Sequence, residues 1–244
     1  MATLTIAKRE FKSYWNSPIA YVVICISLLG LGLVFFNFNG GFFEANRASL
    51  ALLFERLPRA LGYVVIPVIT MRLVAEEKRS GTLEMLITLP VKDHQVILGK
   101  FLGALGLVVT LVLATAFYPL MMFGVWDLGS LDSGPVLTAY LGLVLYSAAA
   151  VSIGLFISSL TESQIIAFFV TTVLLFFLHL FGAQMEIGIL PDSVREAAAF
   201  ISFDSRLSGF IRGMVNMRDV VFFLTITAVC LLGSFWALER RKWS

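Results

Sequence analysis

Charged residues are scarce in this chain of 244 residues, at 14% of the total, whereas hydrophobic residues make up 59%. Soluble domains carry about 25% charged and about 45 to 50% apolar residues. A composition so poor in charge excludes an ordinary soluble domain and predicts a membrane protein. The formal net charge of +2 is too small to indicate a nucleic acid or another polyanion as a partner.

Cysteine and histidine are also rare, with two of each. Cys25 and Cys230 both lie in apolar runs, which excludes a disulfide framework. Neither an H-E-x-x-H motif nor a paired-cysteine spacing is present, so no metal site is predicted. The G-x-x-x-x-G-K-[ST] loop that binds nucleotide phosphates is missing too, because the Gly99-Lys100 pair lacks the other residues of that motif. We therefore expect a non-catalytic chain with no cofactor of its own.

Long apolar runs are abundant instead. A helix that crosses the bilayer core needs about 20 mainly apolar residues. Six runs qualify or nearly do: Ile19–Phe36, Ala60–Val74, Phe101–Phe123, Val136–Leu160, Ile165–Phe181 and Val220–Leu238. The second run is the shortest, and its Pro67 removes a backbone N–H and should kink the helix. We predict an all-α polytopic membrane protein, a single transmembrane domain over residues 1–244 with six transmembrane helices.

Lysine and arginine are distributed unevenly between the two ends of these spans. Most of the 18 basic residues lie in the segments that six spans would place on the same side as the N-terminus. Several of the others lie in one long outer segment, residues 182–219, where such charges count less. Because basic segments stay on the cytoplasmic side, both termini are predicted to be cytoplasmic.

The N-terminal stretch LTIAKREFKSYWNSP is amphipathic. Apolar residues recur at steps of three and four, namely Leu4, Ala7, Phe11, Tyr14, Trp15 and Pro18. Lys8, Arg9 and Lys12 face the other way. The pattern favours a helix that lies in the inner headgroup plane, within residues 1–18. The alternative is an ordinary charged flank of the first span.

The last outer segment, residues 182–219, is too long for a plain connector. Ser193 and Glu196 match the capping box that opens a short helix. A second helix is predicted by the apolar spacing of Leu207, Phe210, Ile211, Met214 and Val215. These short amphipathic helices either form a lid on the outer face or merely cap the ends of the spans.

Ionisable side chains within spans are candidates for function because charge is costly in the bilayer. Arg72 and Lys100 lie near inner span ends, so we expect their long side chains to reach the interface. His179, near the outer end of the fifth span and on the opposite side from His94, is expected to be a satisfied structural histidine rather than part of a wet cavity. The spans lack a proton relay or ion-site cluster, which disfavours a self-powered secondary transporter.

An inner segment after the second run carries strong start and stop signals. It reads EEKRSGTLEMLITLP, from Glu76 to Pro90. Lys78 and Arg79 suit the last turn of a helix, and Gly81 can take the left-handed conformation that ends one. The second span is therefore predicted to project beyond the membrane and to end at Gly81.

A separate helix of about two turns is predicted directly after this stop. Thr82 can cap it, Glu84 lies in its first turn and Pro90 prevents its continuation. Only Glu84 and Thr88 are polar in it, on one face, and the rest of its surface is apolar, made by Leu83, Met85, Leu86, Ile87 and Leu89. Such a helix is too short to span a bilayer and is typical of one that docks in a groove of another protein. Burial against the chain's own helices or the lipid surface is the alternative.

The segment EEKRSGTLEMLITLPV resembles the cytoplasmic loop of permease subunits in the ABC-2 family of ATP-binding-cassette transporters. The resemblance is strongest to the branch with the gliding-motility permeases and the nitrous-oxide-reductase maturation permease. Three other stretches fit the same pattern: REFKSYWNSPIAYV, FISFDSRLSGFIRGMVNMRDVVFF and ERRKW. The resemblance covers essentially the whole chain, and the inner segment is its most specific part.

This resemblance implies an ABC-2, type V exporter-like fold in the bacterial inner membrane. It implies that the N-terminal segment 1–18 is an interfacial elbow helix, with Lys8, Arg9, Phe11, Lys12, Tyr14 and Trp15 at the interface. Residues 76–90 would form the cytoplasmic coupling loop, and Leu83 to Leu89 the coupling helix. The implied contact with the ATPase consists of Glu76, Glu77, Arg79, Gly81, Thr82, Leu83, Glu84, Met85, Leu86, Leu89 and Pro90.

The function implied is that of a permease subunit that couples ATP hydrolysis by a separate ATPase to export or mechanical work. ATP and Mg would be bound by a dimer of that ATPase subunit. A second permease subunit, identical or related, is also implied, and an auxiliary membrane or periplasmic subunit is a further candidate partner. The alternative is a membrane scaffold or assembly factor that docks a cytoplasmic protein through the same helix without transport. No polar cluster in the spans specifies a substrate.

Overall fold

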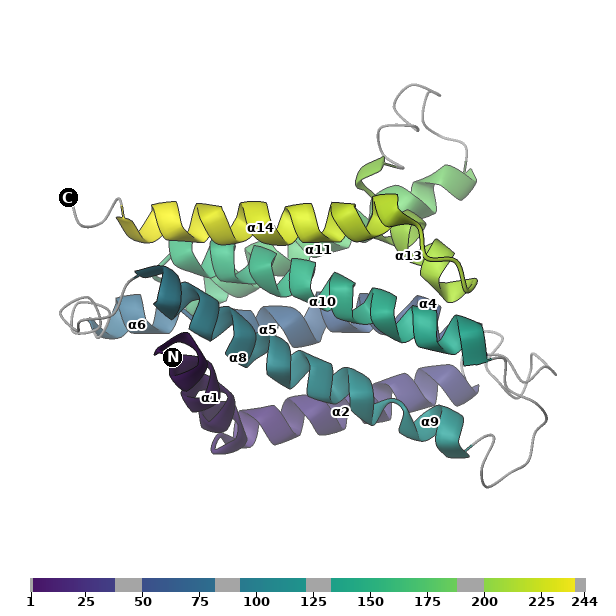
Figure 1. Ribbon diagram of the computed structural model, residues 1–244. Coiled ribbons are helices and arrows are strands. Elements are labelled where there is room, and N and C mark those ends of the chain that lie inside the picture. Colours follow the sequence, from purple (N-terminus) through teal and green to yellow (C-terminus); the bar gives the residue numbers. More distant parts are fainter. Residues whose placement is uncertain (1, 38–49, 82–92, 122–132, 188–199, 240–244) are drawn as a thin grey trace.

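The computed structural model describes residues 2–37, 50–81, 93–121, 133–187 and 200–239. Within these ranges every regular element is a helix, and the long helices run side by side (Figure 1). The start of α1 and the end of α14 lie at the same end of the bundle as α6 (Figure 1). The predicted all-α fold is therefore confirmed for the described part of the chain.

Within each described range, the chain forms helices joined end to end or by short connections. In chain order they are α1 (Ala2–Trp15), α2 (Pro18–Asn37), α4 (Ala51–Ala60), the π-helix η1 (Leu61–Val65), α5 (Ile66–Thr70), α6 (Ala75–Ser80), α8 (Asp93–Ala114), α9 (Phe117–Leu120), α10 (Ser133–Leu160), α11 (Gln164–Ile187), α13 (Phe203–Ile211) and α14 (Met217–Glu239). Residues 71–74 form a turn between α5 and α6.

Four stretches of helix in the described ranges are long and apolar enough to cross a membrane. They are Ala51–Ser80, Asp93–Leu120, Ser133–Leu160 and Met217–Glu239. The first and fifth predicted spans correspond to shorter apolar stretches, Tyr21–Leu33 and Gln164–Leu180. Four of the six predicted spans are thus supported by length and composition, and the total of six stays a prediction.

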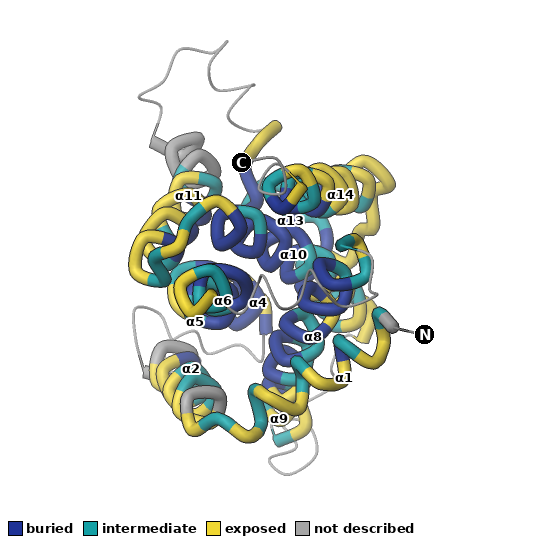
Figure 2. Tube along the Cα trace, turned by 90° about the vertical axis from the view of Figure 1, so that its left-hand side faces the viewer, coloured by how far each residue is buried: buried dark blue, intermediate teal, exposed yellow. Residues whose placement is uncertain are grey.

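Helix α10 forms the centre of the bundle and contacts α5, α8, α11, α13 and α14. In Figure 2 the buried residues gather on α10 and on the facing sides of α8, α4 and α5, whereas α2, α11 and α14 carry exposed outer faces. These outer faces include large apolar side chains such as Leu29, Phe169 and Trp236. In a membrane-embedded bundle such faces contact lipid instead of water.

The second span differs most from its prediction. Its apolar run was the shortest, Ala60–Val74, with a helical extension predicted to end at Gly81, but the helical stretch already begins at Ala51 and, as Ala51–Ser80, is the longest of the four. Helix α4, which adds its first part, contains Glu55, Arg56 and Arg59. These polar residues interrupt the apolar run without ending the helix, because α4 still buries Leu53, Phe54, Leu57 and Pro58 against the core. Apolar run length alone therefore underestimated this span.

Regular α-helix is interrupted just before Pro67, where η1 gives way to α5. A prolyl nitrogen cannot donate to the carbonyl four residues earlier, here that of Tyr63. The hydroxyl of Thr172 on α11 donates to this carbonyl instead, at 3.4 Å. The local π geometry and a hydroxyl from a neighbouring helix thus satisfy the backbone within the bundle.

The outer helix α13 is shorter than its apolar spacing predicted. Leu207 and Phe210 are buried, as expected, but the helix ends at Ile211. Gly213 then takes a left-handed φ of 86°, and Met214 and Val215 are exposed beyond it. A glycine in this conformation stops the helix before the apolar spacing ends. The capping box predicted at Ser193 and Glu196 lies outside the described residues.

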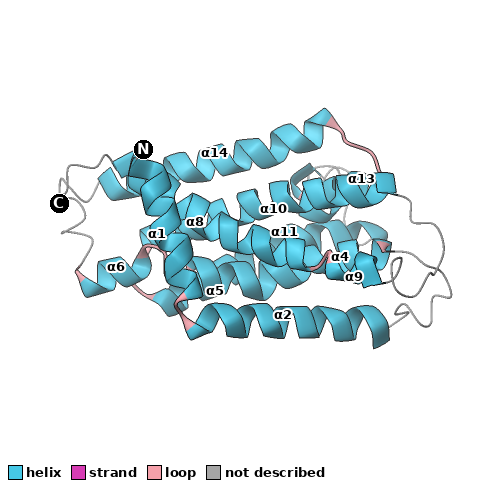
Figure 3. Ribbon diagram, turned by 60° about the horizontal axis from the view of Figure 1, so that its bottom comes forward, coloured by secondary structure: helices cyan, strands magenta, loops and turns pink. Residues whose placement is uncertain are grey.

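Helix α1 crosses the end of the bundle and leads directly into α2 (Figure 3). It packs on a face of α8 that carries Gly99, Gly103 and Gly106. A Cβ added at Gly99 would lie 2.6 Å from Ile6, and one at Gly103 would lie 2.7 Å from the Cβ of Glu10. Glycines at this spacing let two helix backbones approach closely. The α8 glycines therefore create the site where α1 binds.

Gly103→Ala is expected to lower the free energy of unfolding by about 1–3 kcal/mol, the usual range for over-packing. The added methyl group would meet both the Glu10 side chain and the Ala7 carbonyl oxygen, at 3.2 Å from the latter. Gly30→Ala in α2 is the matched control, since nothing lies within 4 Å of a Cβ there. Thermal unfolding of the purified protein, followed by tryptophan fluorescence, measures both variants. Equal Tm values would contradict the close packing of α1 on α8.

Candidate coupling site

Helix α6 prolongs the second span at the end of the bundle where α1 lies. Glu76 and Glu77 occupy its first turn, Lys78 and Arg79 its last turn. Gly81 ends it with a left-handed φ of 69°, and the Gly81 N–H donates to the Lys78 carbonyl at 3.3 Å. The predicted helix end at Gly81 is confirmed.

The start of α6 is held by the end of α10. The Ser158 hydroxyl accepts hydrogen bonds from the N–H groups of Val74 at 3.2 Å and Ala75 at 3.1 Å. These are first-turn donors that have no partner within their own helix. At the other end of α6, the Lys78 ammonium donates to the carbonyl of Ser159. Helix α6 is therefore fixed to the central helix at both of its ends.

Lys100 on α8 is the most buried charge at this end of the described bundle, with 2% of the residue exposed. Its Nζ donates to Glu77 Oε1 at 2.6 Å and to Glu10 Oε1 at 3.2 Å. Its ammonium group thus turns to partners inside the protein, and the expectation that it reaches the membrane interface stays a prediction. Two carboxylates, from α6 and α1, compensate its charge inside the protein, and buried charges persist only when paired in this way.

The predicted amphipathic helix at the N-terminus is present as α1. Lys8, Arg9 and Lys12 are exposed, whereas Phe11 and Trp15 pack against the core. Leu4, assigned to the apolar face, is 71% exposed instead. Much of the apolar face thus contacts α8 and the bundle, and the position of α1 in the headgroup plane stays a prediction.

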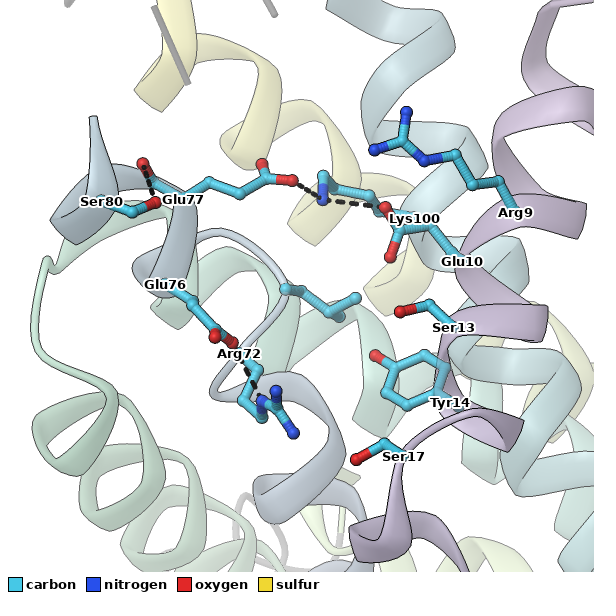
Figure 4. Close-up of a pocket in the computed structure, with 11 residues that line it drawn as sticks. Arg9, Glu10, Ser13, Tyr14, Ser17, Arg72, Glu76, Glu77, Ser80 and Lys100 are labelled. Carbon is cyan, nitrogen blue, oxygen red and sulfur yellow. Dashed lines mark hydrogen bonds and ion pairs between the residues drawn. The ribbon is translucent and has the colours of Figure 1, made fainter. Parts of the chain in front are cut away.

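A cleft of about 330 Å³ separates α1 from the stretch around α6 (Figure 4). Arg72, in the turn before α6, pairs with Glu76 through Nε at 2.9 Å. On the opposite wall the Tyr14 hydroxyl donates to the Ile69 carbonyl at 3.3 Å. Burial, reinforced by the charge of Glu10, raises the pKa of Tyr14 well above its usual value, so this phenol remains a donor.

The predicted ATPase contact is only partly within the described residues. Glu76, Arg79 and Gly81 lie on or directly after α6, and Glu77 points inward to Lys100. The remaining predicted residues, Thr82, Leu83, Glu84, Met85, Leu86, Leu89 and Pro90, lie outside the described residues. Sequence reasoning missed the role of Glu10 and Glu77 as partners of Lys100, since the three residues are far apart in the chain.

A second polar cluster lies at the opposite end of the bundle. His179 is buried, and its Nδ1 lies 2.6 Å from Asp204 Oδ1 while its Nε2 lies 3.0 Å from the Tyr146 hydroxyl. The Tyr146 hydroxyl also lies 2.8 Å from the Pro58 carbonyl oxygen, and Arg59 Nη2 donates to Asp204 Oδ2 at 2.7 Å. The expectation of a satisfied structural histidine is confirmed.

Asp204 is the charged centre of this outer cluster. Burial raises the pKa of its carboxyl group, but the hydrogen bonds and charges of His179 and Arg59 outweigh burial and hold the pKa below its ordinary value. The same carboxylate lines an outer cleft of about 400 Å³ between α4 and α13. Asp204 thus ties α13 to α4 and α11, a link that no sequence motif indicated.

Residues 60–238 match the family described as "ABC-2 family transporter protein". The chain belongs to the ABC-2 family. The matched region runs from the second span through α14 and includes all of α6 and the segment predicted as the coupling helix. Together with its long apolar helices, this membership makes the chain a membrane-embedded subunit of the ABC transporter class.

Two curated relatives show a partial similarity. Each is named "Probable multidrug ABC transporter permease YbhR", one from Escherichia coli (strain K12) and one from Escherichia coli O157:H7. Both are 32% identical over 103 residues, which are 42% of this chain and 27% of each relative. This ABC-2 chain therefore aligns with about a quarter of the length of those proteins.

Asp204→Asn is expected to lower the free energy of unfolding at pH 7 by about 1.5–3 kcal/mol, because hydrogen bonds to a charged group are lost. The Tm should fall accordingly. The pKa of Asp204 is lower in the folded protein than in the unfolded chain, where it is about 3.9. The carboxylate therefore stabilises the fold fully above that pH, and this contribution is lost as the pH falls through the folded-state pKa. The difference in Tm between wild type and variant should shrink as the pH is lowered from 7 to 3. Glu239→Gln, at the exposed end of α14, is the control. A difference that persists or widens in acid would refute this role.

Proposed function

We propose that this chain is the permease subunit through which a separate ATPase drives export or mechanical work across the bacterial inner membrane. Membership of the ABC-2 family supports the transporter class. The single observation that carries the proposal further is the buried ion pair between Lys100 and Glu77, at the base of the segment 82–92. The partners would be a dimer of ATPase subunits that bind ATP and Mg, and a second permease subunit.

The ion pair connects the two helices that flank the proposed coupling segment. Glu77 lies on α6, about one turn before Gly81, and Lys100 lies on α8, about two turns after Asp93. Glu10 adds α1 to the same cluster. Separating Lys100 from these carboxylates would leave a buried charge uncompensated, which costs about 3–5 kcal/mol. A force on the coupling segment would therefore move α6, α8 and α1 together.

The structure also fixes the other contacts of α6. Ser158 at the end of α10 holds the first turn of α6, and the Ser159 carbonyl accepts from Lys78 in its last turn. Motion that reaches α6 would consequently reach the central helix of the bundle as well. This is the contact path expected of a rigid-body switch driven by a partner subunit.

Association with the ATPase tests the proposal directly. Leu83→Glu combined with Leu86→Glu should abolish co-purification of an ATPase subunit expressed with this chain, because charge would replace the apolar docking surface. Leu4→Glu, at an exposed position of α1, is the control and should leave co-purification intact. Unchanged association of the Leu83/Leu86 variant would refute docking through this segment.

Stimulation of ATPase activity in liposomes separates transport from scaffolding. A first panel of amphipathic drugs is suggested by the relatives' name as probable multidrug permeases. Stimulation by a compound of this panel supports a permease. ATPase activity that is indifferent to every candidate substrate would favour a scaffold that docks a cytoplasmic protein.

Lys100→Met is expected to leave ATPase binding intact but to reduce substrate-stimulated ATPase activity several-fold. The substitution removes the ammonium group that joins α6, α8 and α1. Lys12→Met removes an exposed cation from α1 and serves as the control. Both are measured in liposomes with the co-expressed ATPase subunit.

A combined Lys100→Met, Glu10→Gln and Glu77→Gln variant distinguishes coupling from stability. It removes all three charges together, so no buried charge is left without a partner, which is the costly outcome of removing one partner alone. We expect it to recover the Tm of the wild type while stimulation stays reduced. Recovery of full stimulation would show that the ion pairs serve only to stabilise the fold.

A further inference from the structure

The cleft beside Lys100 is lined by balanced charges of both signs. Three basic side chains, Arg9, Arg72 and Lys100, share it with three carboxylates, Glu10, Glu76 and Glu77. Arg9 and Glu10 reach in from α1, whereas Arg72 and Glu76 belong to the opposite wall (Figure 4). A cleft without formal net charge does not attract a simple anion or cation strongly. Its separated charges instead fit a ligand that carries both signs.

Several donors in the cleft keep unused hydrogen-bonding capacity. Arg72 uses Nε for Glu76, which leaves its two terminal nitrogens free of partners among the described residues. The Arg9 guanidinium and the Ser13 hydroxyl, both on α1, make no ion pair or side-chain hydrogen bond within that same part of the chain. Guanidinium groups and hydroxyls are the donors that most often bind phosphate oxygens.

Acceptors are available in the same cleft. Glu10 binds Lys100 through Oε1 and Glu76 binds Arg72 through Oε2, so each carboxylate keeps a second oxygen. The Glu76 side chain is 45% exposed, and that of Glu10 is 22% exposed. Because Lys100 is shared between Glu10 and Glu77, that cluster carries more negative than positive charge. The excess of acceptors suits a ligand ammonium group, which donates up to three hydrogen bonds.

The position of the cleft relative to the membrane indicates where such a ligand comes from. Trp15 ends α1 and packs edge-to-face on Tyr21 near the start of α2, with ring centroids 5.6 Å apart. Tyr21 is half exposed on the outside of the bundle. Tryptophan and tyrosine are enriched at the depth of the lipid headgroups. This pair supports the predicted position of helix α1, which forms one wall of the cleft, at the level of the headgroups.

We propose that this cleft binds the headgroup of a zwitterionic phospholipid with a primary ammonium group. Arg9, Arg72 and Ser13 bind the phosphate, while Glu10 and Glu76 accept hydrogen bonds from the ammonium group. The bound lipid would bridge α1 and the α6 region across the cleft. The proposal requires only that α1 lies at the membrane surface, and it is independent of ATP coupling.

Native mass spectrometry of the purified full chain tests this binding. Phosphatidylethanolamine, phosphatidylcholine and phosphatidylglycerol with identical acyl chains are titrated separately. We expect phosphatidylethanolamine to bind at concentrations about tenfold lower than the other two, which corresponds to about 1.4 kcal/mol. Phosphatidylcholine cannot donate from its quaternary ammonium, and phosphatidylglycerol has no cation. Equal binding of all three lipids would overturn the proposal.

Two variants with the same change in charge locate the site. Arg9→Gln with Arg72→Gln should abolish the preference for phosphatidylethanolamine, and Arg9→Gln alone should weaken it without affecting folding, because Arg9 is exposed. Lys8→Gln with Lys12→Gln, on the exposed face of the same helix, should retain the preference. An equal loss in this control would assign the effect to general electrostatic attraction and contradict the proposal.

Soluble phosphoethanolamine distinguishes a lipid from a small molecule with the same charged groups. If it binds as tightly as the lipid, the ligand is a soluble zwitterion and the lipid assignment is wrong. If it competes only at concentrations at least a hundredfold higher, the acyl chains contribute and the lipid is supported. None of these measurements uses the ATPase, so their failure leaves the proposed permease function untouched.

Discussion

The charge of Lys100 inside the protein is the constraint on which the rest of this end of the bundle depends. A buried ammonium group requires carboxylates within hydrogen-bonding distance, and Glu77 and Glu10 supply them from two different helices. This demand links α1 and α6 to α8 through the two ion pairs of Lys100. The inward direction of Glu77 and the approach of Glu10 follow from satisfying this one charge, whereas Ser158 and Ser159 of α10 anchor α6 separately.

The second span shows how backbone polar groups are satisfied in a region without water. It passes through a π-helical stretch, a proline and a turn, and each departure from α-helix meets a polar side chain from α10 or α11. The Tyr146 hydroxyl lies at the Pro58 carbonyl, the Thr172 hydroxyl at that of Tyr63, and the Ser158 hydroxyl at the N–H groups that open α6. Such breaks are tolerated in membrane helices only where neighbours supply these partners. The span is therefore irregular in its own geometry but fixed by its surroundings.

Local signals in the sequence were sufficient for part of this architecture. The apolar runs located the central parts of the spans, and Gly81 correctly ended α6, because both depend on neighbouring residues alone. Ion pairs between residues far apart in the chain could not be predicted from the sequence. Nothing near Lys100 indicates Glu10 as its partner, and nothing near His179 indicates Asp204. In α13 two local signals conflict. The apolar spacing continues to Val215, but the left-handed conformation of Gly213 ends the helix at Ile211. At the candidate site, the ends of the helices were predictable, but the ion pairs that join them were not.

The glycine face of α8 also affects the order in which the chain is assembled. During synthesis α1 emerges well before Gly99, Gly103 and Gly106, which form its binding surface. Until α8 has entered the membrane, α1 can contact lipid and the first two spans, including the Ile69 carbonyl that accepts from Tyr14, but not the glycine face. Helix α1 therefore takes its final place after the third span has been inserted. Helix α1 is thus made before the surface on which it docks, and its ion pair with Lys100 forms only once α8 is in place.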